Sequence, residues 1–151
     1  MPSIRQRGIV IRESIDPRAS TIEADEMMVR QGLLNILLNA IQASPEGGMI
    51  EMASQYESAW HSKGSNPHAS ASMGGNPIRS LIVRDFGSGI APEDQPRLYD
   101  PFFSNRKGGI GLGLPLARQV MEVHGGWINC ESQLGEGTTL QLCFPQGRKI
   151  E

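Results

Sequence analysis

The strongest constraint on the fold comes from two glycine-bearing segments, residues 85–89 and 108–113. The first follows residues 81–83, a short apolar run with β-branched side chains that predicts a buried strand. The strand ends at Asp85, whose carboxylate can accept hydrogen bonds from a ligand amine. Two glycines follow it and allow positive φ and a close approach of other atoms. This segment therefore predicts a binding surface for a polar ring at the end of a strand.

The second segment suits phosphates. It places Gly108, Gly109, Gly111 and Gly113 directly before a helical pattern, so that free backbone N–H groups can face an anion at a helix N-terminus. The two segments together indicate a nucleotide. Other phosphate motifs are missing, because the chain has no Gly-x-x-x-x-Gly-Lys-Ser/Thr sequence, and residues 85–87 match the protein-kinase Asp-Phe-Gly tripeptide without the rest of that signature.

Length and composition favour one soluble domain. The 151 residues are 38% apolar and 20% charged, which is ordinary for a globular protein with a sizeable core. A formal net charge of −2 and scattered basic residues give no support for nucleic-acid binding. No apolar run approaches the roughly 20 residues that span a membrane. Cys130 and Cys143 lack CxxC spacing, so we expect buried free thiols and a cytoplasmic location, whether the parent protein is soluble or membrane-anchored.

The order of predicted elements indicates helices packed on one face of a mixed sheet. The first half of the chain predicts a strand at 8–15, a helix from an Asp25 N-cap to about Ser44, and a strand at 49–60. A strand ending at Asp85 follows, and then a short helix that begins at Pro92-Glu93-Asp94. The last elements are a helix at 112–124 capped by Gly125 and two strands, 127–132 and 138–144, joined by a glycine turn. Residues 61–77 are rich in Ser, Gly, Asn and Pro and predict a flexible loop. Its His61 and His68 lack partners at metal-ligand spacing.

Helical periodicity predicts which faces point inward. For the second long helix these are Leu116, Val120 and Val123. For the first they are Val29, Leu33, Leu37 and Ala40, with Leu34, Leu38 and Ile41 widening the stripe. A polar stripe of Gln31, Asn35, Asn39 and Gln42 runs along the same helix. The pattern leaves open whether these amides serve a cation and phosphates or form a solvated face.

Four blocks in order carry a family resemblance: Asn35–Ala40, Asp85–Ile90, Pro101–Phe103 and Gly109–Leu114. With the closing turn at 135–138 and the helix end at 124–126, they resemble the catalytic, ATP-binding domain of sensor histidine kinases, in the wider gyrase, chaperone, kinase and mismatch-repair ATPase superfamily with the Bergerat fold. The resemblance spans residues 8–145 and is greatest to the nitrogen-regulation type with a short lid. It implies an α+β fold, a two-layer α/β sandwich whose mixed, mostly antiparallel sheet is covered on one face by helices.

The resemblance also implies a site for ATP and Mg²⁺. Asp85 would hydrogen-bond the adenine amino group, and Asn39 would ligate Mg²⁺ with Asn35 beside it. The expected nucleotide contacts are Asn35, Asn39, Asp85, Gly87, Gly89, Ile90, Arg106, Lys107, Gly109, Gly111, Leu112, Gly113 and Thr138.

Residues 101–110 would form a lid over the ATP. Arg106 and Lys107 would contact the γ-phosphate, although each could also be an exposed surface charge, and Thr138 would support the base pocket or serve as an ordinary strand residue. Gln42 stands where many relatives have Lys, and Ile110 replaces a frequent Thr. Both differences bear on nucleotide affinity rather than on the fold.

The resemblance favours a kinase over an ATPase. The ATPase branches use a glutamate as general base at the position of Asn35, and a neutral amide cannot take a proton from water. The sequence carries no phosphoacceptor histidine motif, so we expect residues 1–151 to be one catalytic domain that lacks the dimerisation and phosphoacceptor domain. It would phosphorylate a histidine on that separate domain, serve a response regulator indirectly, make no membrane contact, and be monomeric and inactive in self-phosphorylation when alone. Three alternatives stay open: a serine kinase of the anti-sigma-factor type, a regulatory module that binds nucleotide without transfer, and a structural α/β domain outside this superfamily whose glycines match by accident.

Overall fold

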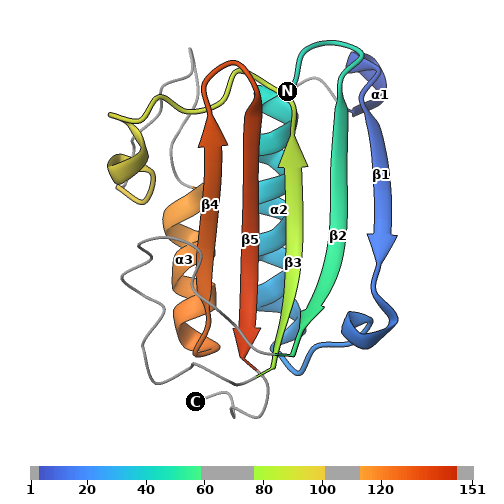
Figure 1. The fold of residues 1–151 in the computed structure, drawn as a ribbon, viewed down its shortest axis with the longest axis vertical. Coiled ribbons are helices and arrows are strands. Elements are labelled where there is room, and N and C mark those ends of the chain that lie inside the picture. Colours follow the sequence, from blue (N-terminus) through green and yellow to red (C-terminus); the bar gives the residue numbers. More distant parts are fainter. Residues whose placement is uncertain (1–3, 59–76, 101–112, 146–151) are drawn as a thin grey trace.

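The computed structural model describes residues 4–58, 77–100 and 113–145. Five strands form one sheet in the order β1-β2-β3-β5-β4, in which β1 and β2 are parallel and the other neighbours antiparallel. The strands are β1 (Val10–Ile15), β2 (Met49–Glu57), β3 (Ile78–Asp85), β4 (Trp127–Gln133) and β5 (Gly137–Pro145). The helices are α1 (Ile4–Arg7), α2 (Glu26–Ala43) and α3 (Gly113–Val123), with 3-10 turns η1 (Pro17–Ala19) and η3 (Gln95–Arg97). Figure 1 shows α2 and α3 behind the sheet, which confirms the α+β two-layer sandwich.

Most of the predicted strands and helices lie where the sequence placed them. The predicted loop falls almost wholly outside the described residues, in 59–76. The short helix differs: residues 92–94 form a turn, and the 3-10 turn η3 begins at Gln95. Its start is later than predicted because Pro96, not Pro92, occupies the first helical turn, where a fixed φ and a missing N–H cost little.

Side chains form hydrogen bonds with the backbone at both ends of α2. The predicted N-cap is confirmed, since Asp25 accepts a hydrogen bond from the Met28 N–H at 3.0 Å. At the other end the Arg7 guanidinium donates to the carbonyl oxygens of Ile41 and Ser44, both at 2.5 Å. A cation at this end also complements the helix dipole. The short helix α1 thereby fixes the C-terminal turn of α2.

The inward face of α2 is displaced from the predicted one. The buried residues are Gly32, Ile36, Ala40 and Ile41. The predicted Leu34 is instead half exposed. The reason is that α2 packs on α3 as well as on the sheet: a Cβ added at Gly32 would lie 3.6 Å from the Val120 side chain. The side of α2 that carries residues 32, 36 and 40 therefore faces both α3 and the sheet, and the leucines of α2 lie at the edges of this buried side.

The predicted inward face of α3 is wrong in one residue. Val120 is buried and Leu116 half-buried, but Val123 is 40% exposed. The buried stripe continues instead through Ala117, Met121 and His124. Val123 lies about 120° from the centre of that stripe at 100° per residue. The C-cap prediction is confirmed: Gly125 has φ +69°, and Gly126 N–H donates to the Met121 carbonyl at 2.9 Å.

A buried histidine joins the two helices. His124 accepts a hydrogen bond from the Asp25 N–H at Nε2, 2.9 Å away, and its Nδ1 lies 2.7 Å from the Val120 carbonyl oxygen. The neutral tautomer with hydrogen on Nδ1 satisfies both contacts. The ring also packs edge-on against Phe144, with centroids 5.9 Å apart. This arrangement fixes the start of α2 to the end of α3.

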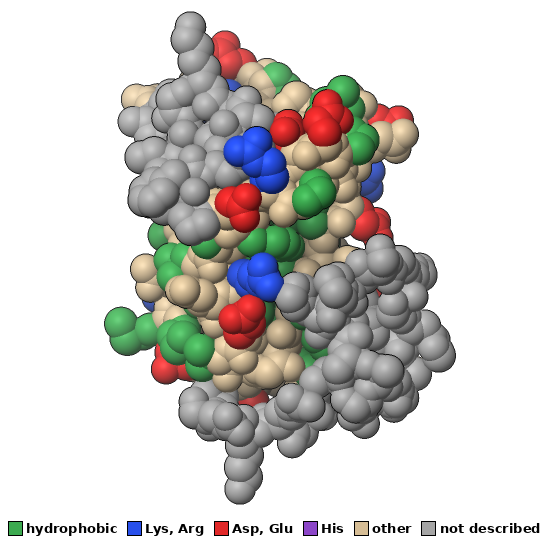
Figure 2. All heavy atoms as spheres, turned by 90° about the vertical axis from the view of Figure 1, so that its left-hand side faces the viewer, with side chains coloured by type: hydrophobic (Ala, Val, Ile, Leu, Met, Phe, Trp, Pro, Cys, Tyr) green, Lys and Arg blue, Asp and Glu red, His purple; other side chains and the backbone are tan. Residues whose placement is uncertain are grey.

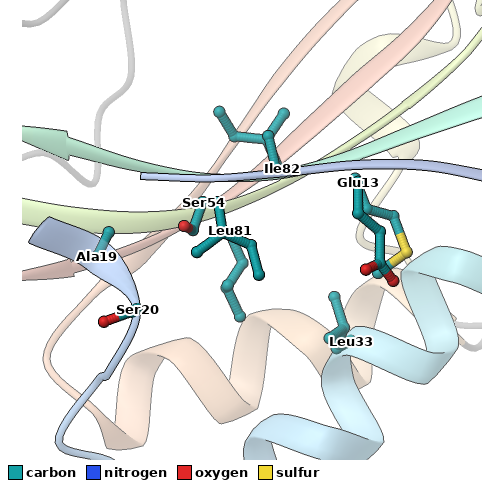
Figure 3. Close-up of a pocket in the computed structure, with 10 residues that line it drawn as sticks. Glu13, Ala19, Ser20, Leu33, Ser54, Leu81 and Ile82 are labelled. Carbon is teal, nitrogen blue, oxygen red and sulfur yellow. The ribbon is translucent and has the colours of Figure 1, made fainter. Parts of the chain in front are cut away.

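The helices leave one part of the sheet uncovered. A cavity of about 190 Å³ lies between the β1–β2 edge and α2 (Figure 3). Glu13 of β1 and Leu33 of α2 line one part of it, and Ala19 and Ser20 line another. None of the predicted nucleotide contacts is among its lining residues. Within the described part of the chain, no helix has the length and apolar character that a membrane span requires.

Candidate functional site

Asp85 ends β3 as an acidic residue in the interior. Its side chain is only 5% exposed, and in the sheet register it lies between Ile50 of β2 and Thr138 of β5. A buried carboxylate is costly unless it is hydrogen-bonded. Asp85 Oδ1 accepts from the Gly87 N–H at 3.0 Å, which turns the backbone sharply after the strand. The predicted acceptor is therefore held at the end of a central strand.

The glycines around Asp85 are required by packing. A Cβ at Gly87 would lie 2.2 Å from the Ala43 carbonyl oxygen, and one at Gly89 would lie 2.1 Å from that of Gln133. Gly89 also has φ +72°, as expected. Gly137 of β5 has φ +119°, and its Cβ would lie 2.2 Å from the Asp85 carbonyl oxygen. The close approach inferred from sequence is thus made, at these positions, by other parts of the backbone.

The β4–β5 hairpin holds the turn that follows Asp85. The Ile90 N–H donates to Ser132 Oγ at 2.8 Å, and the Gly135 N–H donates to the Ser88 carbonyl at 2.6 Å. The Gln95 amide adds a bond to the Ile90 carbonyl at 3.2 Å. We therefore define the Asp85 turn as residues 85–90, which the hairpin holds on its outer side.

Ser132 and Gln95 are not among the residues that the sequence predicts for the site. Ser132 shares a sheet face with the buried Ile128 and half-buried Cys130, and it lies directly opposite Thr138. A hydroxyl in the alternating pattern of a core-facing strand is the signal that could have revealed it. Gln95 has no such signal: its amide donates to the carbonyl of Ile90, five residues earlier in an irregular segment, and to the carbonyl of Ser132, which is 37 positions away.

Helix α2 brings the two predicted asparagines toward this turn. Asn39 is half-buried and precedes Ala43 by four residues, so the two share a helix face. Ala43 in turn contacts Gly87. Asn35 lies one turn earlier and is also half-buried, whereas Gln31 and Gln42, at the ends of the polar stripe, are exposed. The stripe is therefore solvated at its ends and partly covered in its middle.

Part of the predicted site lies outside the described residues. This holds for the predicted lid, for Ile110 and for the contacts Arg106, Lys107, Gly109, Gly111 and Leu112. Gly113 is the first residue of α3, so the predicted helix after the glycine segment is present.

Two weakly acidic side chains near this turn, Cys130 and Tyr99, are held in their neutral forms. Burial, and then the negative charge of Asp85, raise the pKa of Cys130 to about 12. Burial raises the pKa of Tyr99 to about 12 as well, and Arg118 lies 5.2 Å from its ring centre. Arg118 also pairs with Glu122 at 3.1 Å. Figure 2, which looks at the left-hand side of Figure 1, shows basic and acidic side chains interspersed on that face. The Cys130 thiol is thus protonated and unsuited to act as a nucleophile.

The sequence predicts that both cysteines are buried free thiols. Cys130 and Cys143 are free, with Cys143 buried and Cys130 half-buried. Across residues 4–58, 77–100 and 113–145, no three His, Cys, Asp or Glu side chains gather in a group that could hold a metal ion.

Comparison with known proteins gives one family over most of the chain. Residues 24–148 match the family described as histidine kinase-, DNA gyrase B-, and HSP90-like ATPase. The histidine protein kinase DivJ of Caulobacter vibrioides is 31% identical over 91% of this chain, which spans 21% of DivJ. The nucleotide-free catalytic domain of histidine kinase ThkA has a TM-score of 0.72 and 27% identity, covering 95% of this chain and 82% of that one. Full-length ShkA in complex with AMPPNP has a TM-score of 0.71 and 25% identity, covering 97% and 27%.

Proposed function

The chain belongs to the family of histidine kinase-, DNA gyrase B- and HSP90-like ATPases, and from this membership we propose that it is the ATP-binding catalytic domain of a two-component sensor histidine kinase. The observation that carries the proposal is the buried Asp85 at the end of β3, within a turn fixed on both sides by backbone contacts. An acceptor held in this way suits the amino group of adenine. The complex of the structural neighbour ShkA with AMPPNP supports ATP as the ligand.

With the base at the Asp85 turn, the phosphates would extend from there along α2. Asn39 and Asn35 follow one another at one-turn spacing on the half-buried side of that helix. Amide oxygens suit a hard divalent cation that also uses phosphate oxygens as ligands. We therefore assign Asn39 to Mg²⁺, which would neutralise phosphate charge during transfer, with Asn35 beside it. Arg106 and Lys107 remain the proposed γ-phosphate contacts.

The phosphate acceptor would be a histidine of a separate dimerisation domain. His124 is unsuited to the role, because it is 6% exposed and both ring nitrogens make hydrogen bonds within the fold. In the transfer, a ring nitrogen of the acceptor forms a bond to the γ-phosphorus while the bond from that phosphorus to the bridging oxygen breaks, and ADP leaves. The domain supplies mainly positioning. A response regulator would receive the phosphate from the histidine afterwards.

Calorimetric titration of ATP with Mg²⁺ tests the nucleotide site. We expect wild type to bind ATP, and Asp85→Asn to bind it about 10- to 100-fold more weakly, because a charged acceptor of the ligand amine is lost. The substitution keeps an oxygen for the Gly87 N–H, so the turn should persist. Asp25→Asn is the matched control, since asparagine caps a helix as well as aspartate does. Equal ATP affinity in wild type and Asp85→Asn would contradict the proposal.

Phosphate transfer is tested by mixing the chain and ATP with a separately prepared acceptor domain. The chain alone with ATP should incorporate no phosphate and should behave as a monomer. Together with the histidine-containing dimerisation domain of a sensor kinase, it should produce acid-labile phosphohistidine. Phosphorylation of a serine on an anti-sigma antagonist would replace this proposal with a serine kinase, and ATP binding without transfer to any partner would replace it with a regulatory module.

A further inference from the structure

The cavity between the β1–β2 edge and α2 has a floor of apolar side chains. Leu33 of α2, Met52 of β2 and Leu81 of β3 line it, and each of them also packs against the hydrophobic core. Its volume of about 190 Å³ is larger than the roughly 150 Å³ of an apolar cavity that binds benzene in another protein. The space can therefore hold one six-membered ring with a short side chain.

A carboxylate lies beside this apolar floor. Among the described residues that line the cavity, Glu13 is the only one with a charged side chain. Figure 3 shows Glu13 extending from β1 toward Leu33 of α2. Within the described part of the chain, no salt bridge or hydrogen bond engages the Glu13 side chain. The cavity thus combines an apolar floor with a negatively charged hydrogen-bond acceptor.

The position of Glu13 departs from the pattern of its strand. Side chains alternate between the two faces of a strand, so Glu13 shares the helix-facing side of β1 with Ile11, which packs against the core. Its partner in the sheet register, Met52, also packs against the core. An apolar residue is therefore expected at position 13. A charged residue without a partner in an apolar row is a local inconsistency of the kind that marks functional sites.

The arginines close to Glu13 in the chain do not neutralise it. Arg12 is its neighbour in β1 and so points to the opposite face of the sheet. Arg18 pairs with Asp16 at 2.9 Å, and its guanidinium carbon lies 5.0 Å from the centre of the Tyr56 ring. The negative charge of Glu13 is therefore left for a ligand, and a cation that carries an apolar group matches both parts of the cavity.

We propose that this cavity binds a small amphipathic amine, whose apolar part lies on Leu33, Met52 and Leu81 and whose ammonium group pairs with Glu13. The walls come from β1, η1, α2, β2 and β3, an enclosure that fits a compact molecule better than the flat surface of a partner protein. The proposal goes beyond the proposed function, because none of the described lining residues is assigned to the nucleotide.

NMR titration of the whole chain tests the proposal, with 2-phenylethylamine as the probe and 2-phenylethanol as its isostere. At neutral pH the amine is a cation and the alcohol is uncharged. We expect saturable shifts of backbone amides at the lining residues of β1, β2 and α2, with a Kd for the amine on the order of 1 mM. The alcohol should bind at the same residues but about two- to fivefold more weakly, the scale of one exposed charge pair.

Glu13→Gln tests the charge. The variant keeps the size of an exposed side chain, so the fold should persist, and the amine should now bind no more tightly than the alcohol. Glu51→Gln is the matched control, since it removes the same charge. Glu51 precedes Met52 in β2 and so points to the opposite face of the sheet. This control should leave both affinities unchanged.

Leu33→Phe tests the cavity itself. The larger side chain should fill part of the space and weaken both probes by about tenfold or more, because it takes the place of the probe's ring. A melting temperature no lower than that of wild type would confirm that the variant is folded.

Three results would overturn the proposal. One is shifts confined to residues away from the cavity, and another is equal affinity of wild type for the two probes. The third is an equal loss of preference in Glu13→Gln and Glu51→Gln, which would indicate non-specific attraction of the amine to the negatively charged protein. If the same amides shift with protein concentration alone, a second copy of the chain covers the cavity, and the proposed ligand is wrong.

Discussion

The two sides of α2 differ in how completely their surroundings fix the backbone. On one side the Asp85 turn meets the Ala43 carbonyl, with no room for a Cβ at Gly87 or Gly89. On the other side the β1–β2 edge leaves a cavity of about 190 Å³. The ends of β1 are open as well, since Val10 is 56% and Ile15 is 64% exposed. Helix α2 therefore lies between a tightly packed region, the turn at Asp85, and a loosely packed one, the β1–β2 edge.

This difference shows that the Asp85 turn is the part of the structure that is held rigidly in advance. A turn held by backbone contacts on both faces keeps its acceptor in position before a ligand arrives, which lowers the entropy cost of binding. Strand β1 has one sheet neighbour and few helix contacts, so changes there should cost little. Three substitutions or conditions can test this difference.

The largest effect is expected for Gly87→Ala. The Cβ of the alanine would lie 2.2 Å from a backbone atom, the Ala43 carbonyl oxygen. Relieving this clash requires the backbone of the turn or of α2 to shift, which is costly in free energy. We expect a loss of about 3 kcal/mol in unfolding free energy, measured by urea denaturation, together with loss of ATP binding. Gly47→Ala is the control: it has φ +73° but nothing within 4 Å of its Cβ, so it should cost about 1 kcal/mol for the backbone conformation alone. Similar losses in both variants would show that the turn is not tightly packed.

A smaller effect is expected at alkaline pH on the tightly packed side. Folding raises the pKa of Cys130 from 9.0, and of Tyr99 from 10.0, to about 12. The folded state therefore favours the neutral groups, and the unfolded chain loses their protons first. Stability should be fully present below pH 9 and should fall between pH 9 and about 12. Urea titrations across this range check the slope, which Tyr99→Phe should reduce; an unchanged slope would argue against burial of Tyr99.

The smallest effect is expected for Ile15→Thr on the loosely packed side. The side chain is largely exposed at the end of an edge strand, and threonine keeps the β-branched shape. Unfolding free energy should change by no more than about 0.5 kcal/mol, and ATP affinity should not change. A cost as large as that of Gly87→Ala would show that the β1 edge is as firmly packed as the turn.

Some features of the site were predictable from sequence because their causes are local. Asp25 caps a helix through a bond to Met28, three residues away, and Asp85 bends the chain through Gly87, two residues away. Other features were not predictable, because the partners are far apart in the chain. Ser132 reaches Ile90 across 42 positions, and Gly87 is required by a carbonyl of α2.

The sequence by itself determined the order of strands and helices, the caps, and an acidic residue followed by glycines at the end of a strand. These depend on periodicity and on hydrogen bonds between near neighbours, which any stretch of chain carries with it. Only the tertiary structure decided that Ile36 rather than Leu34 lies inward, and that Val123 is exposed. Which side of a helix is buried depends on the second helix and the sheet that meet it, and residues distant in sequence set that contact.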